Sequence, residues 1–240
     1  MADPVSPRIE PLPASATLAQ RVVAELVGTA FLVAAVIGSG IAATRLSPDD
    51  VGLQLLENSL VTGAALVALI LALQPVSAAF NPVVTVVERA FGLIGTTTAA
   101  ALIAAQVIGG VLGAVLANLM FDLSPVSIAT TDRTGSHLWL AEVVATLGLV
   151  LVVFGSLRTQ RTSTVAFAVG GYITAAYWFT SSTSFANPAV TIGRSFSDTF
   201  AGIAPASAPM FVLMQLVGGA LAALIVRFLF PEPRTTEEMR

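Results

Sequence analysis

The hydrophobic positions of this chain form long continuous runs separated by short polar segments. Six runs reach the length of about 20 apolar residues that a helix needs to cross a hydrocarbon core of about 30 Å. They cover residues 21–45, 52–74, 96–121, 137–157, 163–181 and 205–230. The pattern therefore predicts an all-α membrane protein with six transmembrane helices.

Two further apolar segments, residues 81–91 and 187–199, are too short to cross a bilayer. Each begins with an Asn-Pro pair, at Asn81 and at Asn187. Asn is a favoured helix N-cap and Pro is favoured at the first helical position. Irregular backbone at membrane depth must be satisfied by protein or water. We therefore interpret both segments as re-entrant half-helices beside a polar, water-accessible interior.

Three blocks of sequence recur in the same order in the two halves of the chain. AELVGTAFLV returns as AEVVATLGLV, NPVVT returns as NPAVT, and QVIGG returns as QLVGG. Each half holds three crossings, an odd number, so the second half must start from the opposite face of the membrane. The sequence predicts an inverted repeat in one channel domain, residues 21–230, with repeat 1 at about 21–121 and repeat 2 at about 137–230.

Composition supports the membrane class and excludes several others. Hydrophobic residues make up 55% of the 240 residues and charged residues 10%, against about 25% charged in soluble domains. Zero Cys and a single His leave no thiolate or histidine cluster for a metal, so we expect no metal or cofactor. No close carboxylate pair lies within the apolar runs for acid-base chemistry, so we expect no enzyme. All 11 basic residues are Arg, and they are scattered, which excludes a nucleic-acid interface.

Arginine placement predicts the orientation. With six crossings both termini share one side of the membrane, and eight of the 11 Arg fall on that side. The positive-inside rule makes this side cytoplasmic. We therefore expect a multi-pass protein of the cell (inner) membrane, with cytoplasmic tails at residues 1–20 and 231–240.

The two half-helices indicate the function. In an inverted repeat their N-termini, each equivalent to about +0.5 charge, can meet near the midplane. Such a field opposes the passage of cations and protons, but it has little effect on a neutral solute that forms hydrogen bonds. Glu25 and Glu142 are repeat partners inside the first and fourth runs. We expect their carboxylates to accept hydrogen bonds from the irregular segments before each Asn-Pro pair, with a proton relay as the alternative role.

These features together resemble the aquaporin or major intrinsic protein family. The duplicated family motif is matched by Asn81, Pro82, Val83, Asn187, Pro188 and Ala189. Val83 stands where the family usually has Ala. The resemblance covers about residues 21–230. It implies a homotetramer with one pore per subunit for water, glycerol-like polyols or other small neutral solutes, with the Asn pair at the midplane constriction.

The resemblance also implies an outer selectivity filter of four side chains. They are Thr62, Ala175, Ser184 and Val190. Val61 is the alternative to Thr62, because the stretch before the first motif is one residue short of the family pattern. Val190 stands where the family usually has Arg, so this ring has no fixed cation and is expected to be wide. A Val here resembles a bacterial branch associated with arsenic detoxification, which implies passage of arsenite and methylated arsenicals beside small polyols.

Two charged residues of the half-helices stay unassigned. Arg194 lies one turn beyond Val190 and is the repeat partner of Glu88, since each follows its Asn by seven residues. We expect Arg194 in the outer vestibule. Tyr177, at the end of the fifth run, is interpreted as part of an interfacial aromatic belt.

A secondary transporter is the alternative to a passive channel, because inverted repeats and broken helices build both. The chain lacks paired intramembrane charges that would couple a solute to an ion. This lack favours the channel.

Overall fold

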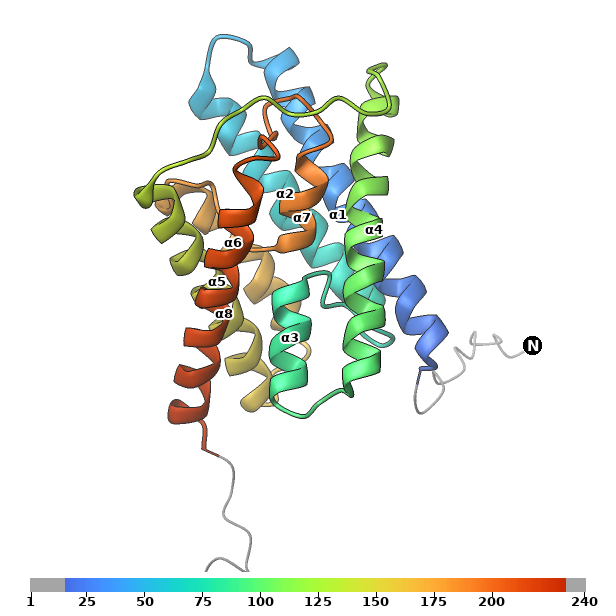
Figure 1. Ribbon diagram of the computed structural model, residues 1–240, viewed down its shortest axis with the longest axis vertical. Helices are drawn as coiled ribbons and strands as arrows, with labels where there is room; N and C mark the ends of the chain where they lie inside the picture. Colours follow the sequence, from blue (N-terminus) through green and yellow to red (C-terminus); the bar gives the residue numbers. More distant parts are fainter. Residues whose placement is uncertain (1–15, 232–240) are drawn as a thin grey trace, which may run out of the picture.

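All regular structure in residues 16–231, the part of the chain that the computed structural model describes, is helical. In chain order the helices are α1 (Leu18–Leu46), α2 (Val51–Leu73), α3 (Pro82–Ala90), α4 (Thr96–Met120), α5 (Ser136–Arg158), α6 (Val165–Phe179), α7 (Pro188–Arg194) and α8 (Ala208–Leu229). The long helices run along the vertical axis of Figure 1. The predicted all-α membrane class is confirmed.

Five helices, α1, α2, α4, α5 and α8, are long and apolar enough to cross a membrane. The helix of the predicted fifth run is shorter, because α6 has 15 residues and Thr180 after it takes extended backbone. The predicted tail to residue 20 gives way to α1 at Leu18, where Thr17 and Gln20 form a capping box. Most of the two predicted tails lies outside the described residues.

The two short segments form separate helices, α3 with 9 residues and α7 with 7. The second is shorter than the sequence predicts: α7 ends at Arg194, before the predicted limit of residue 199. Polar side chains hold the chain in another path there. The Ser197 hydroxyl donates to Asn118 Oδ1 over 2.7 Å, and Asp198 accepts from the Thr130 N–H over 2.9 Å.

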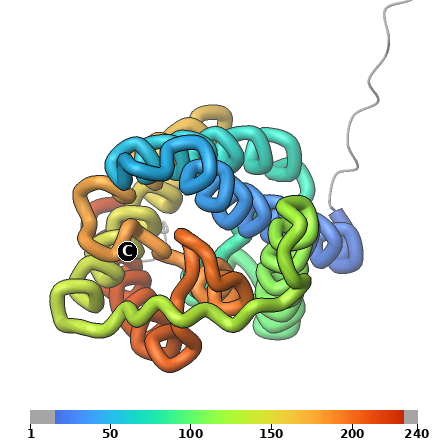
Figure 2. Tube along the Cα trace, turned by 90° about the horizontal axis from the view of Figure 1, so that it is seen from above, coloured from blue at the N-terminus to red at the C-terminus, as the bar shows by residue number. Residues whose placement is uncertain are grey.

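The half-helices occupy opposite ends of the bundle. Figure 1 shows α3 in the lower half and α7 in the upper half, and both pack against α4. Figure 2, seen from above, shows the longer helices arranged around them. The segment 121–135 crosses the end of the bundle near α7 and pairs with the chain that follows α7, as the Ala129 N–H donates to the Ser195 carbonyl over 3.0 Å.

Glycines let the long helices cross closely at equivalent places in the two halves. A Cβ on Gly109 in α4 would overlap the Leu26 carbonyl oxygen of α1. A Cβ on Gly218 in α8 would overlap the Val143 carbonyl oxygen of α5. Small residues at crossings are the usual basis of close helix packing in membranes. The α1–α4 and α5–α8 pairs are therefore built alike, as a sequence repeat requires.

Candidate functional site

Both Asn-Pro pairs begin a helix in the way that the sequence predicts. Asn81 Oδ1 accepts from the Val83 N–H over 2.9 Å, and Asn187 Oδ1 accepts from the Ala189 N–H over 2.9 Å. A proline occupies the first position of each helix, where its missing N–H leaves nothing unsatisfied. The two Asn side chains are thus N-caps, and their positions fix where α3 and α7 begin.

The same two amides tie the half-helices to each other. Asn81 Nδ2 donates to the Ala186 carbonyl over 2.8 Å, and Asn187 Nδ2 donates to the Phe80 carbonyl over 2.7 Å. Each Asn therefore bonds the residue that precedes the other Asn. This reciprocal contact brings the two helix N-termini, with their partial positive charges, to one place in the molecule.

Glu25 holds the irregular segment before the first motif. Its Oε1 accepts from the Ser77 hydroxyl over 2.5 Å and from the Ala79 N–H over 2.9 Å. Its Oε2 accepts from the Phe80 N–H over 2.7 Å and from Gln106 Nε2 over 2.8 Å. The bond to Phe80 matters most, because φ there is 48°, a left-handed conformation that a bulky residue rarely adopts.

Glu142 holds the irregular segment before the second motif in the same way. Its two oxygens accept from the Ser182 hydroxyl at 2.6 Å, the Phe185 N–H at 3.0 Å, the Ala186 N–H at 2.9 Å and Gln215 Nε2 at 2.6 Å. Ala186 also has a left-handed φ, of 49°. Both carboxylates are fully buried and do what the sequence analysis expects: they satisfy irregular backbone at membrane depth.

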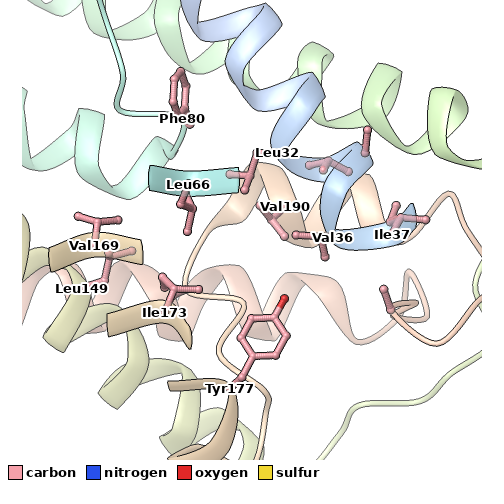
Figure 3. Packing of buried hydrophobic residues seen from close by; sticks show 14 of the residues in the cluster. Leu32, Val36, Ile37, Leu66, Phe80, Leu149, Val169, Ile173, Tyr177 and Val190 are labelled. Atoms are coloured by element: carbon pink, nitrogen blue, oxygen red, sulfur yellow. The ribbon is translucent and has the colours of Figure 1, made fainter. Parts of the chain in front are cut away.

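A cavity of about 430 Å³ runs past the meeting point of the two half-helices. Asn81 and Asn187 both line it. Most of the remaining wall is apolar and comes from α1, α2, α5 and α6, as Figure 3 shows for Leu32, Val36, Leu66, Leu149, Val169 and Ile173. The cavity therefore has a mainly apolar wall that polar side chains interrupt at fixed points, which is the common build of a small-solute site.

Three of the four side chains expected in the outer filter line this cavity. They are Thr62, Ser184 and Val190, which are 3%, 3% and 5% exposed. Val61, the alternative to Thr62, is 44% exposed and points away. Of these two residues, only Thr62 therefore lines the cavity.

Ala175 does not belong to this group, and the expectation was wrong. It is exposed on the outer side of α6 and does not line the cavity. The cavity wall of α6 is made by Val165, Val169, Ile173 and Tyr177, which recur every four residues. Ala175 lies two residues after Ile173, and two residues correspond to about 200° around a helix. This four-residue stripe was visible in the sequence and could have been used.

Tyr177 is the residue that the sequence analysis missed. It is 3% exposed, so it does not belong to an interfacial belt, whereas its neighbours Trp178 and Phe179 are 50% and 57% exposed. Its hydroxyl lies 3.1 Å from Thr62 Oγ1. Figure 3 shows Tyr177 projecting from α6 toward Val190.

Arg194 is the residue that the sequence predicts to lie in the outer vestibule. It is 2% exposed and lines the same cavity as Val190. Its Nε donates to the Ala201 carbonyl, and its Cζ lies 3.4 Å from the centroid of the Phe185 ring. A second guanidinium, that of Arg133, lies 5.1 Å from the same ring. Burial lowers the pKa of Arg133, in the outer segment 121–135, from its ordinary value.

Glu88 lines the cavity from α3, the half-helix of the opposite end. Its Oε2 is buried and has no hydrogen-bond partner among the described residues. Arg194 and Glu88, the two repeat partners, therefore put unlike charges on the two halves of the wall. The described part of the chain contains no group of three or more acidic or His side chains that could hold a metal ion.

Comparison with known proteins gives concordant matches. The family model described as Major intrinsic protein matches residues 13–164 and 156–240. Aquaglyceroporin AqpS of Rhizobium meliloti is 48% identical over 218 residues, which are 90% of this chain and 93% of that protein. Aquaporin Z of Rhodopseudomonas palustris is 29% identical, over 88% of this chain and 93% of its own length. The X-ray structure of the aquaglyceroporin from Plasmodium falciparum superposes with a TM-score of 0.70 at 16% identity, over 90% of this chain and 98% of that one.

Proposed function

Because this chain belongs to the major intrinsic protein family, we propose that it is a passive transmembrane channel for small uncharged solutes. Water and glycerol-like polyols are the principal substrates. Its similarity to an aquaglyceroporin over nine tenths of the chain supports this class of solute. Members of the family are channels and not enzymes.

The observation that carries the proposal is the meeting of two Asn-capped helix N-termini at the wall of one cavity. Asn81 and Asn187 each donate to the segment before the other motif. Two partial positive charges at one level of a pore oppose a cation or a proton on a chain of waters. A neutral solute that accepts hydrogen bonds meets no such opposition, and Asn81 and Asn187 then form the midplane constriction.

The outer filter is proposed to be wide. Thr62, Ser184 and Val190 are small, and the position after the second motif carries no guanidinium. The pore is therefore proposed to admit solutes larger than water, including uncharged arsenite and methylated arsenicals. A filter that admits water but excludes larger solutes would require a narrower ring.

The carboxylates disfavour the alternative, a secondary transporter coupled to protons. Glu25 and Glu142 each accept four hydrogen bonds. All four hydrogen bonds of each carboxylate hold the segment before a motif or a neighbouring helix in place, so both carboxylates are engaged in bracing the half-helices. The structural role of both residues is therefore the one we propose.

Stopped-flow light scattering of proteoliposomes tests the function directly. Vesicles with the purified protein are expected to respond faster than empty vesicles to gradients of water, glycerol, urea and arsenite. The rates should rise linearly with solute concentration and need no ion gradient. Saturation at low millimolar solute, or dependence on a sodium or proton gradient, would show a transporter instead.

The assembly and placement of the chain follow as proposals from the family. We infer a homotetramer with one pore per subunit in the cell (inner) membrane, and both termini in the cytoplasm. Apolar side chains on the outside of the helices, such as Phe31, Leu60 and Phe167 at 62%, 53% and 59% exposure, suit contact with lipid or a neighbouring subunit. Chemical cross-linking in membranes would show a ladder up to four subunits.

A further inference from the structure

Arginine side chains gather around one phenylalanine ring at the end of the bundle where α3 and α8 finish (Figure 1). The guanidinium carbon of Arg158, the last residue of α5, lies 5.6 Å from the centroid of the Phe91 ring. That of Arg227, in the last turn of α8, lies 5.3 Å from the same centroid. Arg89, in the last turn of α3, precedes Phe91 by two residues. The proposed channel function gives none of these three cations a role.

Phe91 and its neighbours fix this cluster to the fold. Phe91 is the C-cap of α3, and its ring packs edge-on against the Phe154 ring of α5, with centroids 5.1 Å apart. Arg158 follows Phe154 by four residues, about one turn of the same helix. Arg227 Nη2 donates to the Ala90 carbonyl over 2.8 Å, which ties α8 to the last turn of α3. The ends of three helices therefore hold the arginines together.

The helix ends offset only part of the positive charge. A helix C-terminus is equivalent to about −0.5 charge, so three of them beside three guanidiniums leave about +1.5. The partners of Arg89 and Arg227 among the described residues are neutral, namely the Thr96 hydroxyl and the Ala90 carbonyl. Glu88, the acidic residue nearest to Arg89 in the sequence, lines the cavity inside the protein. The cluster is therefore a site of net positive charge.

Two of these guanidiniums also keep donors for a ligand. Each guanidinium carries five N–H donors. Arg89 uses its Nε for Thr96 Oγ1 over 2.8 Å, and Arg227 uses Nη2 for the Ala90 carbonyl. Both side chains are exposed. The planar fork of Arg suits the oxygens of a phosphate group. An anion bound between like charges also offsets the repulsion between them.

Exposed apolar side chains lie next to the arginines in the chain. Leu93, two residues after Phe91, is 60% exposed, and Leu224 and Phe228 on α8 are 63% and 85% exposed. The arginines lie at the ends of helices, which is the level of the lipid headgroups when such helices cross a bilayer. A free anion would contact the arginines alone. A phospholipid has both an anionic group for the arginines and acyl chains for the apolar side chains.

From this arrangement we propose that Arg89, Arg158 and Arg227 form a binding site for the headgroup of an anionic phospholipid. The guanidiniums donate to the phosphate oxygens, and Leu93 and Phe228 contact the acyl chains. The bound lipid holds the ends of α3, α5 and α8 together and so stabilises the half-helix α3. The proposal needs only that the helices cross a membrane, and it is independent of which solutes the channel passes.

The test measures lipid binding to the full chain in detergent. Phosphatidylglycerol and phosphatidylcholine with the same acyl chains are titrated into the protein, and native mass spectrometry gives an apparent dissociation constant for each lipid. Phosphatidylglycerol should bind more tightly. Arg227→Gln and Arg89→Gln should each weaken phosphatidylglycerol binding about 5-fold, the contribution of one Arg near an anionic lipid surface. Phosphatidylcholine binding should stay unchanged in both variants.

Arg45 provides a matched control at the opposite end of the bundle (Figure 1). Its Nη2 donates to the Phe121 carbonyl over 2.8 Å, and its guanidinium carbon lies 5.3 Å from the Phe121 ring centroid. Arg227 shows the same two distances to Ala90 and Phe91. Among the described residues only Arg45 places a guanidinium over the Phe121 ring. Arg45→Gln thus removes an equivalent cap and ring contact without a cluster, and it should leave phosphatidylglycerol binding unchanged.

Arg89→Gln keeps the test valid if Arg227→Gln does not fold. Arg89 donates to the Thr96 side chain and caps no helix carbonyl, so its replacement should have little effect on the melting temperature in detergent without lipid. A 5-fold loss of phosphatidylglycerol binding by this variant would then come from the lost charge. Unchanged phosphatidylglycerol binding in Arg89→Gln and in every folded Arg227 variant would refute the site.

Three further outcomes would also overturn the proposal. Equal affinity of the unmodified protein for the two lipids would show that the headgroup charge is not recognised. An equal loss of binding in Arg45→Gln would show that any arginine at a helix end contributes as much. If inorganic phosphate raised the melting temperature as much as phosphatidylglycerol does, the cluster would bind an adventitious ion only. Absence of solute flux in proteoliposomes would instead refute the channel and leave the lipid site standing.

Discussion

The effect of Val190 on the pore has to be considered together with Arg194, the residue one turn after it. Val190 and Arg194 both line the cavity from α7, so the position without a charge and the position with one share a wall. Val190→Arg should reduce glycerol permeability at least about tenfold while water permeability falls much less, because the longer side chain narrows the ring. The reduction corresponds to about 1.4 kcal/mol. Stopped-flow rates for both solutes in the same vesicles provide the measurement.

The control for this substitution is Val190→Leu, which adds one methylene group and no charge. It should slow glycerol by less than the Arg variant does. If Val190→Arg and the unmodified protein transported every solute equally, Val190 would not be part of the constriction.

Tyr177 and Ala175 form the second test at this scale. Tyr177→Phe removes the hydroxyl that lies 3.1 Å from Thr62 Oγ1, and it should change the glycerol-to-water permeability ratio and lower stability by about 1 kcal/mol. Ala175→Val changes a side chain that is exposed on α6 and should alter neither quantity. If Ala175→Val changed the glycerol-to-water permeability ratio and Tyr177→Phe did not, Ala175 and not Tyr177 would be the filter residue of α6.

The contrast between these residues shows which site positions a sequence can locate. Ser184 and Val190 line the same cavity, as the prediction requires, and they lie within three residues of Asn187 on the same segment. The position of Ala175 was obtained by counting back from Asn187 across a turn and the end of α6. An error of one or two residues in such a count changes the direction of the side chain around the helix by about 100° to 200°. Counting from a motif is reliable within an element and fails between elements.

At the scale of elements, the half-helices depend on the two buried carboxylates. Glu142→Gln replaces one acceptor oxygen by an NH₂ group, which then faces two of the four donors, from Ser182 and Phe185 or from Ala186 and Gln215. Each unsatisfied buried donor costs about 1–3 kcal/mol. The variant should therefore melt at least about 5 °C lower, as measured by tryptophan fluorescence in detergent.

Glu57→Gln is the matched control, because Glu57 is half-buried and accepts one hydrogen bond, from the Ser47 hydroxyl over 2.8 Å. Its melting temperature should change little. If Glu142→Gln melted like the unmodified protein but lost transport, the carboxylate would belong to a proton relay.

Element boundaries show a further limit of sequence reasoning. The apolar run predicted the second half-helix to residue 199, but α7 ends at Arg194. The next residues bond Asn118 and Thr130, which are more than 60 residues earlier in the chain, with sequence separations of 79 and 68. Composition cannot reveal such long-range partners. The helix starts were predictable because an Asn-Pro cap is local.

At the scale of the whole molecule, the inverted repeat is visible in matched polar contacts. Gln106 joins Glu25 to Thr85 in the first half, with Nε2 distances of 2.8 and 2.9 Å. Gln215 makes the equivalent contacts to Glu142 and Thr191 in the second half, at 2.6 and 2.9 Å. The repeat was predictable because these residues are fixed by bonding partners. Glu88 and Arg194 are repeat partners of opposite charge that both line the cavity, so the repeat is not symmetric at this position of the wall.

The halves also meet directly, where α2 of the first packs on α6 of the second. A Cβ on Gly170 would lie 2.6 Å from the Gly63 carbonyl oxygen and 2.5 Å from Val67 Cγ2. Gly170→Ala should therefore separate the two helices and lower the melting temperature by several degrees, since overpacking costs about 1–3 kcal/mol. Because Thr62 and Tyr177 lie on these same two helices, the variant should also change the glycerol-to-water permeability ratio.

Gly171 gives the control at the adjacent position, since a Cβ there meets nothing within 4 Å. Gly171→Ala should melt at or slightly above the unmodified protein, because Ala is a better helix former than Gly by about 0.8–1.0 kcal/mol. Both variants add the same methyl group to the same helix, so backbone propensity cancels from their comparison and the difference reports the α2–α6 contact. Equal melting temperatures for the two variants would mean that this contact does not hold the halves together.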